Sequence, residues 1–197
     1  MFSATVEKAL SVALAAHEGQ RRKASNDPYV IHPLHVALVL ARWGQDEDVI
    51  VAGLLHDVVE DCEGWDLARL EAEFGRHIAR TVAELTEDKS KSWDERKRAG
   101  IEKVARLSPQ AATAKAADKL HNLHSLALAL RACSNPDEVW SRFRRDRETT
   151  LALSHELVEA LCTRVEPKVA RALRAAAKAA DDADADAFRR SAAAAAN

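Results

Sequence analysis

Apolar side chains recur every three to four residues along most of the chain, which is the period of an α-helix. Alanine, leucine, glutamate and arginine, which favour helices, dominate these segments, and runs of β-branched residues are short. The pattern predicts an all-α fold, a helical bundle of about eight to ten helices. The expected helices span residues 3–17, 33–43, 47–61, 66–74, 76–86, 93–106, 109–132 and 136–164.

Proline and serine mark the start of the longest expected helix. Pro109 stands where its missing N–H costs nothing, because the first amides of a helix have no partner within the helix. Ser108, directly before it, suits the N-cap position. Pro33 and Pro136 take the same place in two other expected helices.

The composition changes near residue 165. Residues 1–165 are predicted to form one domain, while residues 166–197 are alanine-rich and carry few large apolar side chains. This C-terminal segment is expected to be a frayed helix or a disordered tail. Two polar stretches, residues 18–31 and 87–98, are predicted to be functional loops.

Composition and charge exclude several classes of protein. A net charge of −2 argues against broad binding to nucleic acid, which needs a large basic excess. The sequence has no apolar run of about 18 residues and no clean apolar stretch at its N-terminus, so neither a membrane span nor a signal peptide is expected. The three cysteines show no disulfide or zinc spacing, which favours the reducing cytoplasm. Homo-oligomerisation stays open.

Polar residues gather on one side of the expected helix 47–61. At 100° per residue, the valines near Leu55 fall on one face of this helix. The opposite half carries an imidazole and three carboxylates, those of His56, Asp57, Glu60 and Asp61. An ordinary amphipathic helix with a solvated face would explain this pattern. Crowded carboxylates repel one another, however, and a bound cation would relieve the repulsion.

Two more residues extend this cluster. His32 opens an expected helix, and Asp118 lies in the long helix 109–132. Each has a simpler explanation, since His32 could be packed locally and Asp118 could pair with Lys115 or Lys119. Together with the His56–Asp57 pair they make two imidazoles and two carboxylates, a donor set that suits manganese, iron or zinc.

These residues lie in motifs that resemble a known family. The stretches AAHEGQRRK, DPYVIHPLHVA, AGLLHDVVED, EFGRHIARTVAELTEDK, DERK and KAADKLHNLHSL occur in this order over roughly residues 5–145. The chain is similar to HD-domain phosphohydrolases, and more narrowly to the hydrolase domain of RelA/SpoT-type enzymes as a stand-alone small alarmone hydrolase. The resemblance implies an HD-type metal-dependent hydrolase domain over residues 1–165.

The resemblance also implies roles for individual residues. It assigns metal ligation, with Mn²⁺ the usual ion, to His32, His56, Asp57 and Asp118. It makes Glu60 and Asp61 the catalytic acidic pair. It places Arg22 and Lys23 in the nucleotide pocket, with Asn122 close to the ribose or phosphate. The expected reaction removes the 3′-diphosphate of guanosine tetra- or pentaphosphate, giving GDP or GTP and pyrophosphate.

The residues support this chemistry in part. Glu60 stands one turn after His56, so its carboxylate can reach a water at the expected metal and act as general base. Because the substrate is highly anionic, cations must come from elsewhere, and Arg22 and Lys23 on the first polar loop can supply them. The basic residues of 87–98 could contribute too, although a solvated charged face explains them equally well.

Three alternative functions stay open at this point. A related HD enzyme could dephosphorylate another nucleotide or nucleotide cofactor with the same fold and metal. A non-catalytic module could sense the alarmone, but such a domain would be expected to lose part of the His and Asp set, which this sequence keeps. A purely structural helical protein would have no need for that set.

Overall fold

The computed structural model describes residues 3–22 and 26–195, most of which lie in helices. Within those two ranges the only β-type pairing is an isolated bridge between Arg21 and Pro28. The all-α prediction is confirmed. Lys23 lies outside the described residues. None of the described helices is long and apolar enough to cross a membrane.

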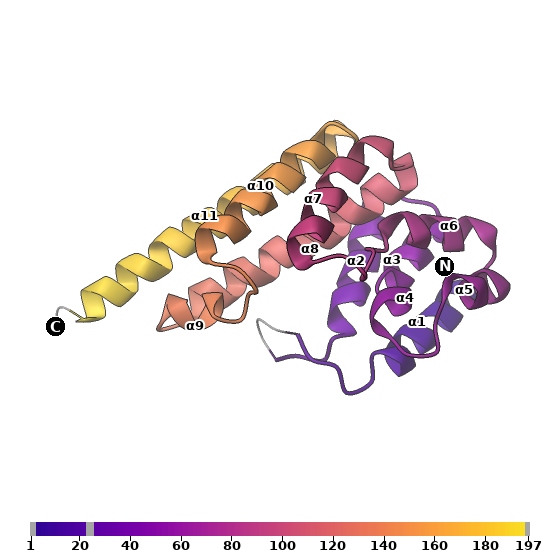
Figure 1. Cartoon of the computed structure of the whole chain (residues 1–197), viewed down its shortest axis with the longest axis horizontal. Helices are drawn as coiled ribbons and strands as arrows, with labels where there is room; N and C mark the ends of the chain where they lie inside the picture. The colour runs from indigo at the N-terminus through magenta and orange to yellow at the C-terminus, as the bar shows by residue number, and fades with distance from the viewer. Residues whose placement is uncertain (1–2, 23–25, 196–197) are drawn as a thin grey trace.

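The helices follow one another with short connections (Figure 1). The first six are α1 (Ala4–Ala16), α2 (Ile31–Arg42), α3 (Glu47–Leu55), α4 (Val58–Asp61), α5 (Leu67–Phe74) and α6 (Arg76–Leu85). They are followed by α7 (Trp93–Lys103), the 3₁₀ helix η1 (Val104–Arg106), α8 (Pro109–Ala132), α9 (Pro136–Trp140), α10 (Arg147–Cys162) and α11 (Pro167–Ala195).

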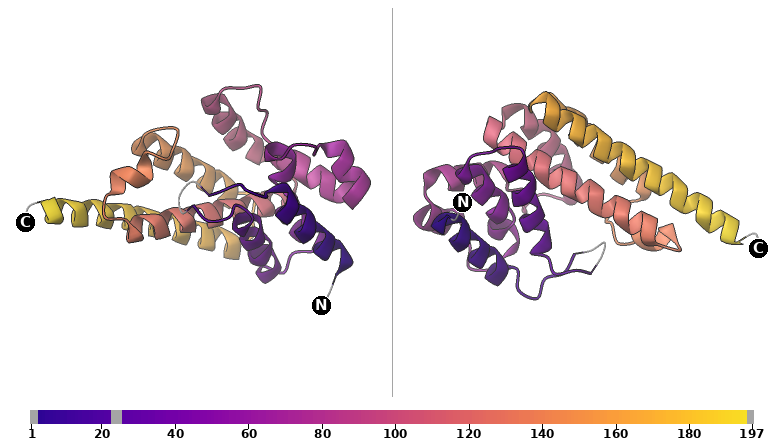
Figure 2. Two further views of the ribbon diagram at one scale, coloured as in Figure 1. Left: turned by 90° about the horizontal axis from the view of Figure 1, so that it is seen from below. Right: turned by 180° about the vertical axis from the view of Figure 1, so that it is seen from behind.

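Two apolar clusters form the core and divide the molecule into two ends. One cluster joins α1, α3, α5 and α6 around buried side chains such as Leu54, Leu55 and Leu70. The other joins α2, α8, α10 and α11 around Leu40, Leu130 and similar residues. Figures 1 and 2 show the first group of helices at one end and the long helices α8, α10 and α11 extending away from it.

Helices α2 and α3 pack closely where the two groups meet. Gly53 faces Val36 and Leu40, and a Cβ at position 53 would overlap the end of the Leu40 side chain. A larger residue at position 53 would therefore have to displace the buried Leu40 side chain. The close packing matters for function, because it brings the start of α2 beside the end of α3.

Two expected helices are interrupted. The segment 47–61 divides into α3 and α4 at His56 and Asp57. His56 is the C-cap of α3, and its Nδ1 lies 2.8 Å from the carbonyl oxygen of Gly53, one of the carbonyls that a helix end leaves without a partner. The segment 136–164 divides into α9 and α10 because Asp146 caps a new helix, accepting a hydrogen bond from the Thr149 amide at 2.8 Å.

The alanine-rich segment forms one helix, α11, that packs along α8. Its buried face consists mostly of small side chains, Val169, Ala170, Leu173, Ala176, Ala177, Ala180, Ala183 and Ala187. Small residues let two helix backbones approach, so this segment contributes to the core despite its few large apolar residues. Of the two expected forms, a helix or a disordered tail, the structure has the helix, and residues 167–195 pack along α8 instead of fraying. The division of the chain at residue 165 stays a prediction.

A buried carboxylate fastens α11 to α9 and α10. Asp184 is 1% exposed and accepts hydrogen bonds from the Trp140 indole at 2.9 Å and from Arg147 Nε at 2.6 Å. We expect Asp184→Ala to lower the free energy of unfolding by about 1–3 kcal/mol, because the buried indole N–H loses its acceptor. Urea denaturation measures this change.

Asp182 provides the matched control for Asp184 on the same helix. Its ion pair with Lys178 is exposed on both sides, so Asp182→Ala should leave the free energy of unfolding nearly unchanged. Equal effects of the two substitutions would show that the Asp184 network does not hold α11 in place.

Candidate functional site

The end of α3 and the start of α2 place two imidazoles face to edge. His32 and His56 have ring centroids 5.1 Å apart, and both side chains are buried. Since the Gly53 carbonyl can only accept, the Nδ1 of His56 carries the proton. The Nε2 atom of a neutral His56 is therefore a free lone pair that faces the site.

Asp57 lies at the break between α3 and α4, next to both imidazoles. Its Oδ2 is 3.1 Å from His56 Nε2 and 3.6 Å from His32 Nε2, and it accepts a 2.7 Å hydrogen bond from the Tyr29 hydroxyl. Burial would raise the pKa of Asp57, but the imidazoles of His56 and His32 outweigh it and hold that pKa well below its usual range. Asp57 is thus a carboxylate ion near neutral pH.

Asp118 reaches the same point from the middle of α8. Its Oδ1 lies 3.3 Å from His32 Nε2 and accepts a 2.6 Å hydrogen bond from Asn122 Nδ2, while its Oδ2 pairs with Lys115 at 3.1 Å. Burial opposes ionisation, but the charges of Lys115 and His32 hold the pKa of Asp118 well below its usual range. The expected pairing with Lys115 therefore exists, and it does not take Asp118 away from the imidazoles.

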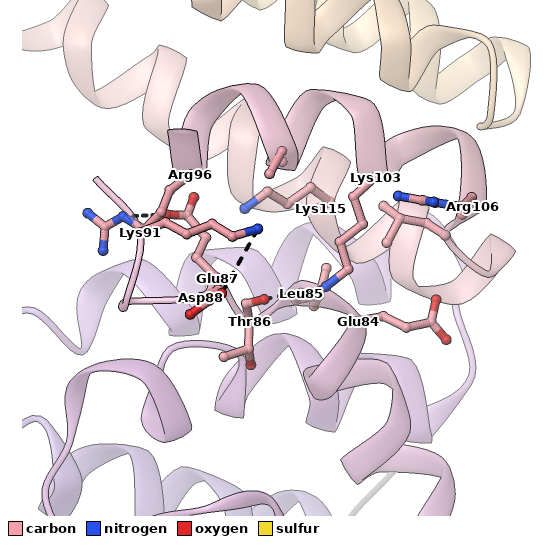
Figure 3. Close-up of a pocket in the computed structure, with 13 residues that line it drawn as sticks. Glu84, Leu85, Thr86, Glu87, Asp88, Lys91, Arg96, Lys103, Arg106 and Lys115 are labelled. Carbon is pink, nitrogen blue, oxygen red and sulfur yellow. Dashed lines mark hydrogen bonds and ion pairs between the residues drawn. The ribbon is translucent and has the colours of Figure 1, made fainter. Parts of the chain in front are cut away.

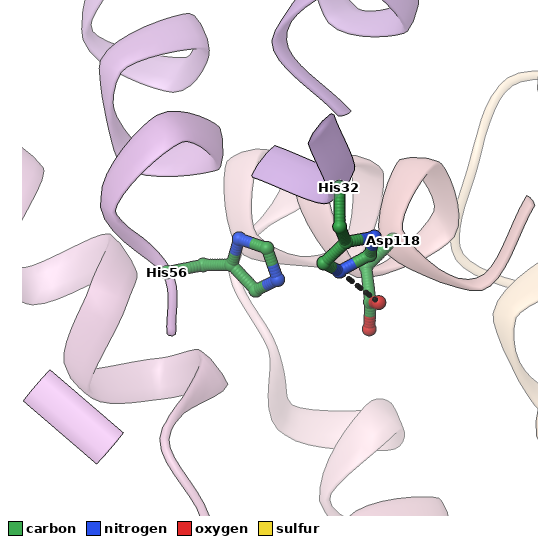
Figure 4. Close-up of side chains that lie close together, drawn as sticks. All are labelled: His32, His56 and Asp118. Atoms are coloured by element: carbon green, nitrogen blue, oxygen red, sulfur yellow. Dashed lines mark ion pairs between the residues drawn. The ribbon is translucent and has the colours of Figure 1, made fainter. Parts of the chain in front are cut away.

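These side chains form an arrangement that could hold a metal ion. His32, His56 and Asp118 each present one donor atom, and the three atoms lie within 4.8 Å of one another (Figure 4). The His56 Nε2 is buried and has no hydrogen-bond partner among the described residues, although a carboxylate lies beside it. Imidazole nitrogens and carboxylate oxygens that gather this closely around one point suit a shared cation. Two nitrogens and carboxylate oxygens are the mixed set that divalent transition metals accept.

Without a cation, the nearby carboxylates raise the pKa of His56 instead. Burial lowers the pKa of His56, but the contact with Asp57 and the charge of Asp118 outweigh this effect and raise it to about 9. A bound cation would replace the proton on His56 Nε2, since a ligating imidazole must be neutral.

Glu60 and Asp61 lie at the edge of this cluster, on the short helix α4. Glu60 Oε2 accepts a 3.2 Å hydrogen bond from the backbone amide of Glu87, and Asp61 Oδ1 pairs with Lys89 at 2.7 Å. Burial, opposed by the bond from Glu87 and assisted by nearby carboxylates, raises the pKa of Glu60. Lys89 also donates to the Glu60 carbonyl oxygen, so the segment after α6 fixes the acidic pair from outside.

Arg22 connects the first polar loop to α8. Its Nη2 donates a 2.8 Å hydrogen bond to Asn122 Oδ1, and its guanidinium lies 5.5 Å from the centre of the Tyr29 ring. The structure thus brings Arg22 and Asn122 together and joins them to Asp118 through the amide of Asn122. Lys23, expected beside Arg22, falls outside the described residues.

A pocket of about 540 Å³ opens over this cluster. The predicted residues Arg22, His32, Asp57, Glu60, Asp61, Asp118 and Asn122 all line it. Its walls also include aromatic rings and several cations, among them Trp93, Phe143, Arg21, Lys89, Arg96 and Lys97. The second charged stretch of the sequence therefore contributes to the pocket wall, which the sequence left undecided.

A second pocket, of about 420 Å³, adjoins the first and shares Glu87, Arg96 and Lys115 with it (Figure 3). The charged side chains that line it pair with one another or with backbone carbonyl oxygens. Glu87 pairs with Lys97 at 2.6 Å and with Arg96 at 3.6 Å, and the Lys103 ammonium lies 3.4 Å from two backbone carbonyl oxygens at the end of α6. These contacts support the segment that carries Glu87 and Lys89 against the acidic pair.

Two residues at the site had no role that the sequence could assign. Tyr29, in the first polar loop, donates its hydroxyl hydrogen to Asp57. His121, on α8, has its Nδ1 2.8 Å from the Nδ1 of His32. Its spacing of three residues from Asp118 gives both side chains a similar direction on the helix, which is the signal that could have indicated it.

Comparison with known proteins places the sequence among related enzymes. The family model described as HD domain matches residues 9–148. The chain is 39% identical over 148 residues to the guanosine-3′,5′-bis(diphosphate) 3′-pyrophosphohydrolase MESH1 of Drosophila melanogaster, covering 74% of this chain and 79% of that protein. It is 40% identical over 127 residues to MESH1 of Homo sapiens, covering 63% and 70%.

The chain also resembles solved structures of similar sequence. A structure described as "A metazoan ortholog of SpoT hydrolyzes ppGpp and plays a role in starvation responses" matches with a TM-score of 0.78 and 32% identity, over 89% of this chain and 95% of that one. A Listeria monocytogenes EGD-e protein matches with a TM-score of 0.64 and 36% identity, over 77% and 97%.

Proposed function

Since the chain belongs to the HD-domain family, we propose that it is a metal-dependent hydrolase of guanosine 3′,5′-bis(diphosphate). It removes the 3′-diphosphate and releases GDP, or GTP from the pentaphosphate, together with pyrophosphate. The observation that carries this proposal is the convergence of His32, His56, Asp57 and Asp118 under a pocket lined by cations. Relatives that this chain covers over more than two thirds of their length bear the name of this activity.

Manganese is the proposed ion, held by His32, His56, Asp57 and Asp118. When bound, the cation polarises a phosphoryl oxygen and lowers the pKa of water. The residues around the ligands support this assignment. Tyr29 holds Asp57, Asn122 and Lys115 hold Asp118, and the Gly53 carbonyl orients His56. Such outer contacts fix the direction of each donor atom before any ion binds.

Glu60 is the proposed general base. A water attacks the phosphorus next to the 3′ oxygen, and its proton passes to the Glu60 carboxylate as the new P–O bond forms. The bond between that phosphorus and the 3′ oxygen breaks, and the 3′ oxygen takes up a proton from solvent and leaves as the hydroxyl. The raised pKa of Glu60 favours proton uptake near neutral pH. Asp61, fixed by Lys89, orients the water.

The pocket supplies the charge that the anionic substrate needs. Arg22 and Asn122 lie beside the ligand Asp118, where the ribose or the 3′-diphosphate would bind. Lys97 and Arg96, both on α7, extend the cationic wall. Lys23 is proposed to act with Arg22. Arginine suits this task because its planar fork binds phosphate in a bidentate manner.

Product analysis tests the proposal directly. Purified protein, stripped with EDTA and then given Mn²⁺, should convert guanosine tetraphosphate to GDP and pyrophosphate, while the stripped protein without added metal should not. A panel of other 2′- or 3′-phosphorylated nucleotides and cofactors, assayed in parallel, tests substrate preference. Faster turnover of another nucleotide would replace the proposed substrate, and release of single phosphate would contradict the proposed bond cleavage. A cytoplasmic location stays a prediction, and the oligomeric state stays open.

A further inference from the structure

We propose that His121 is a positioning residue that holds His32 in the tautomer able to bind the metal, an inference that rests on the proposed function. Its hydrogen bond would fix which ring nitrogen of His32 carries the proton. His121 itself would touch neither the ion nor the substrate.

The geometry places the two rings for this contact. The Nδ1 atoms of His32 and His121 are 2.8 Å apart, and both side chains are buried, at 1% and 8% exposure. The opposite nitrogen of His32, Nε2, faces Asp118 at 3.3 Å and Asp57 at 3.6 Å, which is the direction of the proposed ion. His32 therefore contacts His121 with one nitrogen and the metal position with the other.

The position of one proton links these two contacts. Two ring nitrogens 2.8 Å apart need one proton between them, since two would clash and none would leave two lone pairs opposed. An ion at His32 Nε2 requires a lone pair there, so in a neutral ring the proton is on His32 Nδ1. His121 Nδ1 must then accept the hydrogen bond, and the second nitrogen of His121 carries its proton.

The other imidazole of the site shows the same arrangement with a different acceptor. His56 Nδ1 donates to the carbonyl oxygen of Gly53, which can only accept. The acceptor for His32 is the side chain of His121, whose ring could also donate. Because this acceptor is a side chain and not a backbone carbonyl, a substitution at position 121 can remove or replace it. His35 packs edge-on against the His121 ring, with centroids 4.8 Å apart.

Two substitutions separate an acceptor role from a packing role. In His121→Asn the amide oxygen is bonded to Cγ, as Nδ1 is in histidine, so an acceptor returns to nearly the same place. His121→Leu fills similar space without an acceptor. We expect the leucine variant to bind Mn²⁺ about 10–100-fold more weakly, the usual cost of losing an outer-shell partner of a ligand, and the asparagine variant to stay within about threefold of wild type.

The measurement is a titration of each EDTA-stripped variant with Mn²⁺ alone, following the free ion by electron paramagnetic resonance. Urea unfolding of the stripped proteins shows that each variant is folded. If His121→Leu does not fold, His121→Phe, a ring without an acceptor, takes its place. His124→Leu, an exposed histidine on the same helix, is the control and should bind Mn²⁺ like wild type.

Wild-type affinity in His121→Leu would overturn the inference. Equal losses in the leucine and asparagine variants would overturn it as well, since they would show that His121 acts by packing. Both results leave the proposed function standing. Failure of the wild-type protein itself to bind Mn²⁺ would overturn the metal site of the proposed function and the inference together.

Discussion

Asp118→Asn should weaken Mn²⁺ binding by at least about 100-fold and remove hydrolysis of guanosine tetraphosphate. Loss of an outer-shell partner already costs about 10–100-fold in metal affinity, and Asp118 is proposed as a ligand. Its carboxylate is also the only proposed ligand on α8, so it joins the two ends of the molecule at the ion. A neutral amide oxygen is a poorer donor for a divalent cation, and the metal contributes several kcal/mol to the chemical step.

Lys115→Met is the control for this substitution. Asp118→Asn also breaks the ion pair with Lys115, and Lys115→Met breaks the same pair while the carboxylate stays. We expect Lys115→Met to weaken Mn²⁺ binding by about 10-fold, the low end of the cost of losing an outer contact of a ligand and clearly less than in Asp118→Asn, measured by the same titration. Asp118→Asn protein that binds Mn²⁺ and turns over substrate like wild type would remove Asp118 from the ligand set.

Local signals in the sequence were sufficient for most of the helices. Ser108 and Pro109 mark the start of α8, where Ser108 accepts a hydrogen bond from the Ala111 amide, and the helix ends at Ala132 as expected. Cap residues act within one turn, so the sequence alone specifies them. The residues His56, Asp57, Glu60 and Asp61 were also predictable as a group, because they lie close together along one short segment.

Tertiary contacts decided what the sequence could not predict. Helical periodicity continues through residues 47–61, and nothing in that pattern shows that His56 bonds to Gly53 and that the helix is interrupted there. The role of Tyr29 depends on a contact with Asp57, 28 positions away. The proximity of His32 to Asp118 depends on how α2 packs on α8, so the sequence could suggest it from the residue types and the family resemblance but could not give its geometry.

The alanine-rich segment shows the limit of composition as a guide. Its few large apolar residues suggested too little burial to offset the entropy of ordering the chain. In the structure α11 instead buries a face of small side chains against α8. Because these side chains are small, the two helix backbones lie close together, and the interface does not need large apolar residues. Asp184, which looked like one acidic residue among several, is buried because Trp140 and Arg147 satisfy it. Neither partner is near it in the sequence.

Glu60→Gln should lower kcat by about 10²–10⁴ while Mn²⁺ binding stays close to that of wild type. The amide keeps the shape of the side chain and can still accept the hydrogen bond from the Glu87 amide, but it cannot take a proton from water. Because burial raises the pKa of Glu60, wild-type kcat should fall as pH decreases through that pKa, where the carboxylate becomes protonated. In the glutamine variant this acid limb should be absent. Steady-state assays across pH, with bound Mn²⁺ measured on each sample, report both effects.

Glu63→Gln is the matched control, since Glu63 is an exposed glutamate three residues further along the chain, just past α4. It should leave kcat, its pH profile and the metal content unchanged. The pH profile separates two explanations for a slow Glu60 variant. If Glu60 only supported the segment around Glu87, the glutamine variant would keep the acid limb of the wild type at a lower rate. If Glu60 is the base, the limb and most of the rate disappear together. Wild-type turnover in Glu60→Gln protein that holds its full complement of Mn²⁺ would assign the proton transfer to another group.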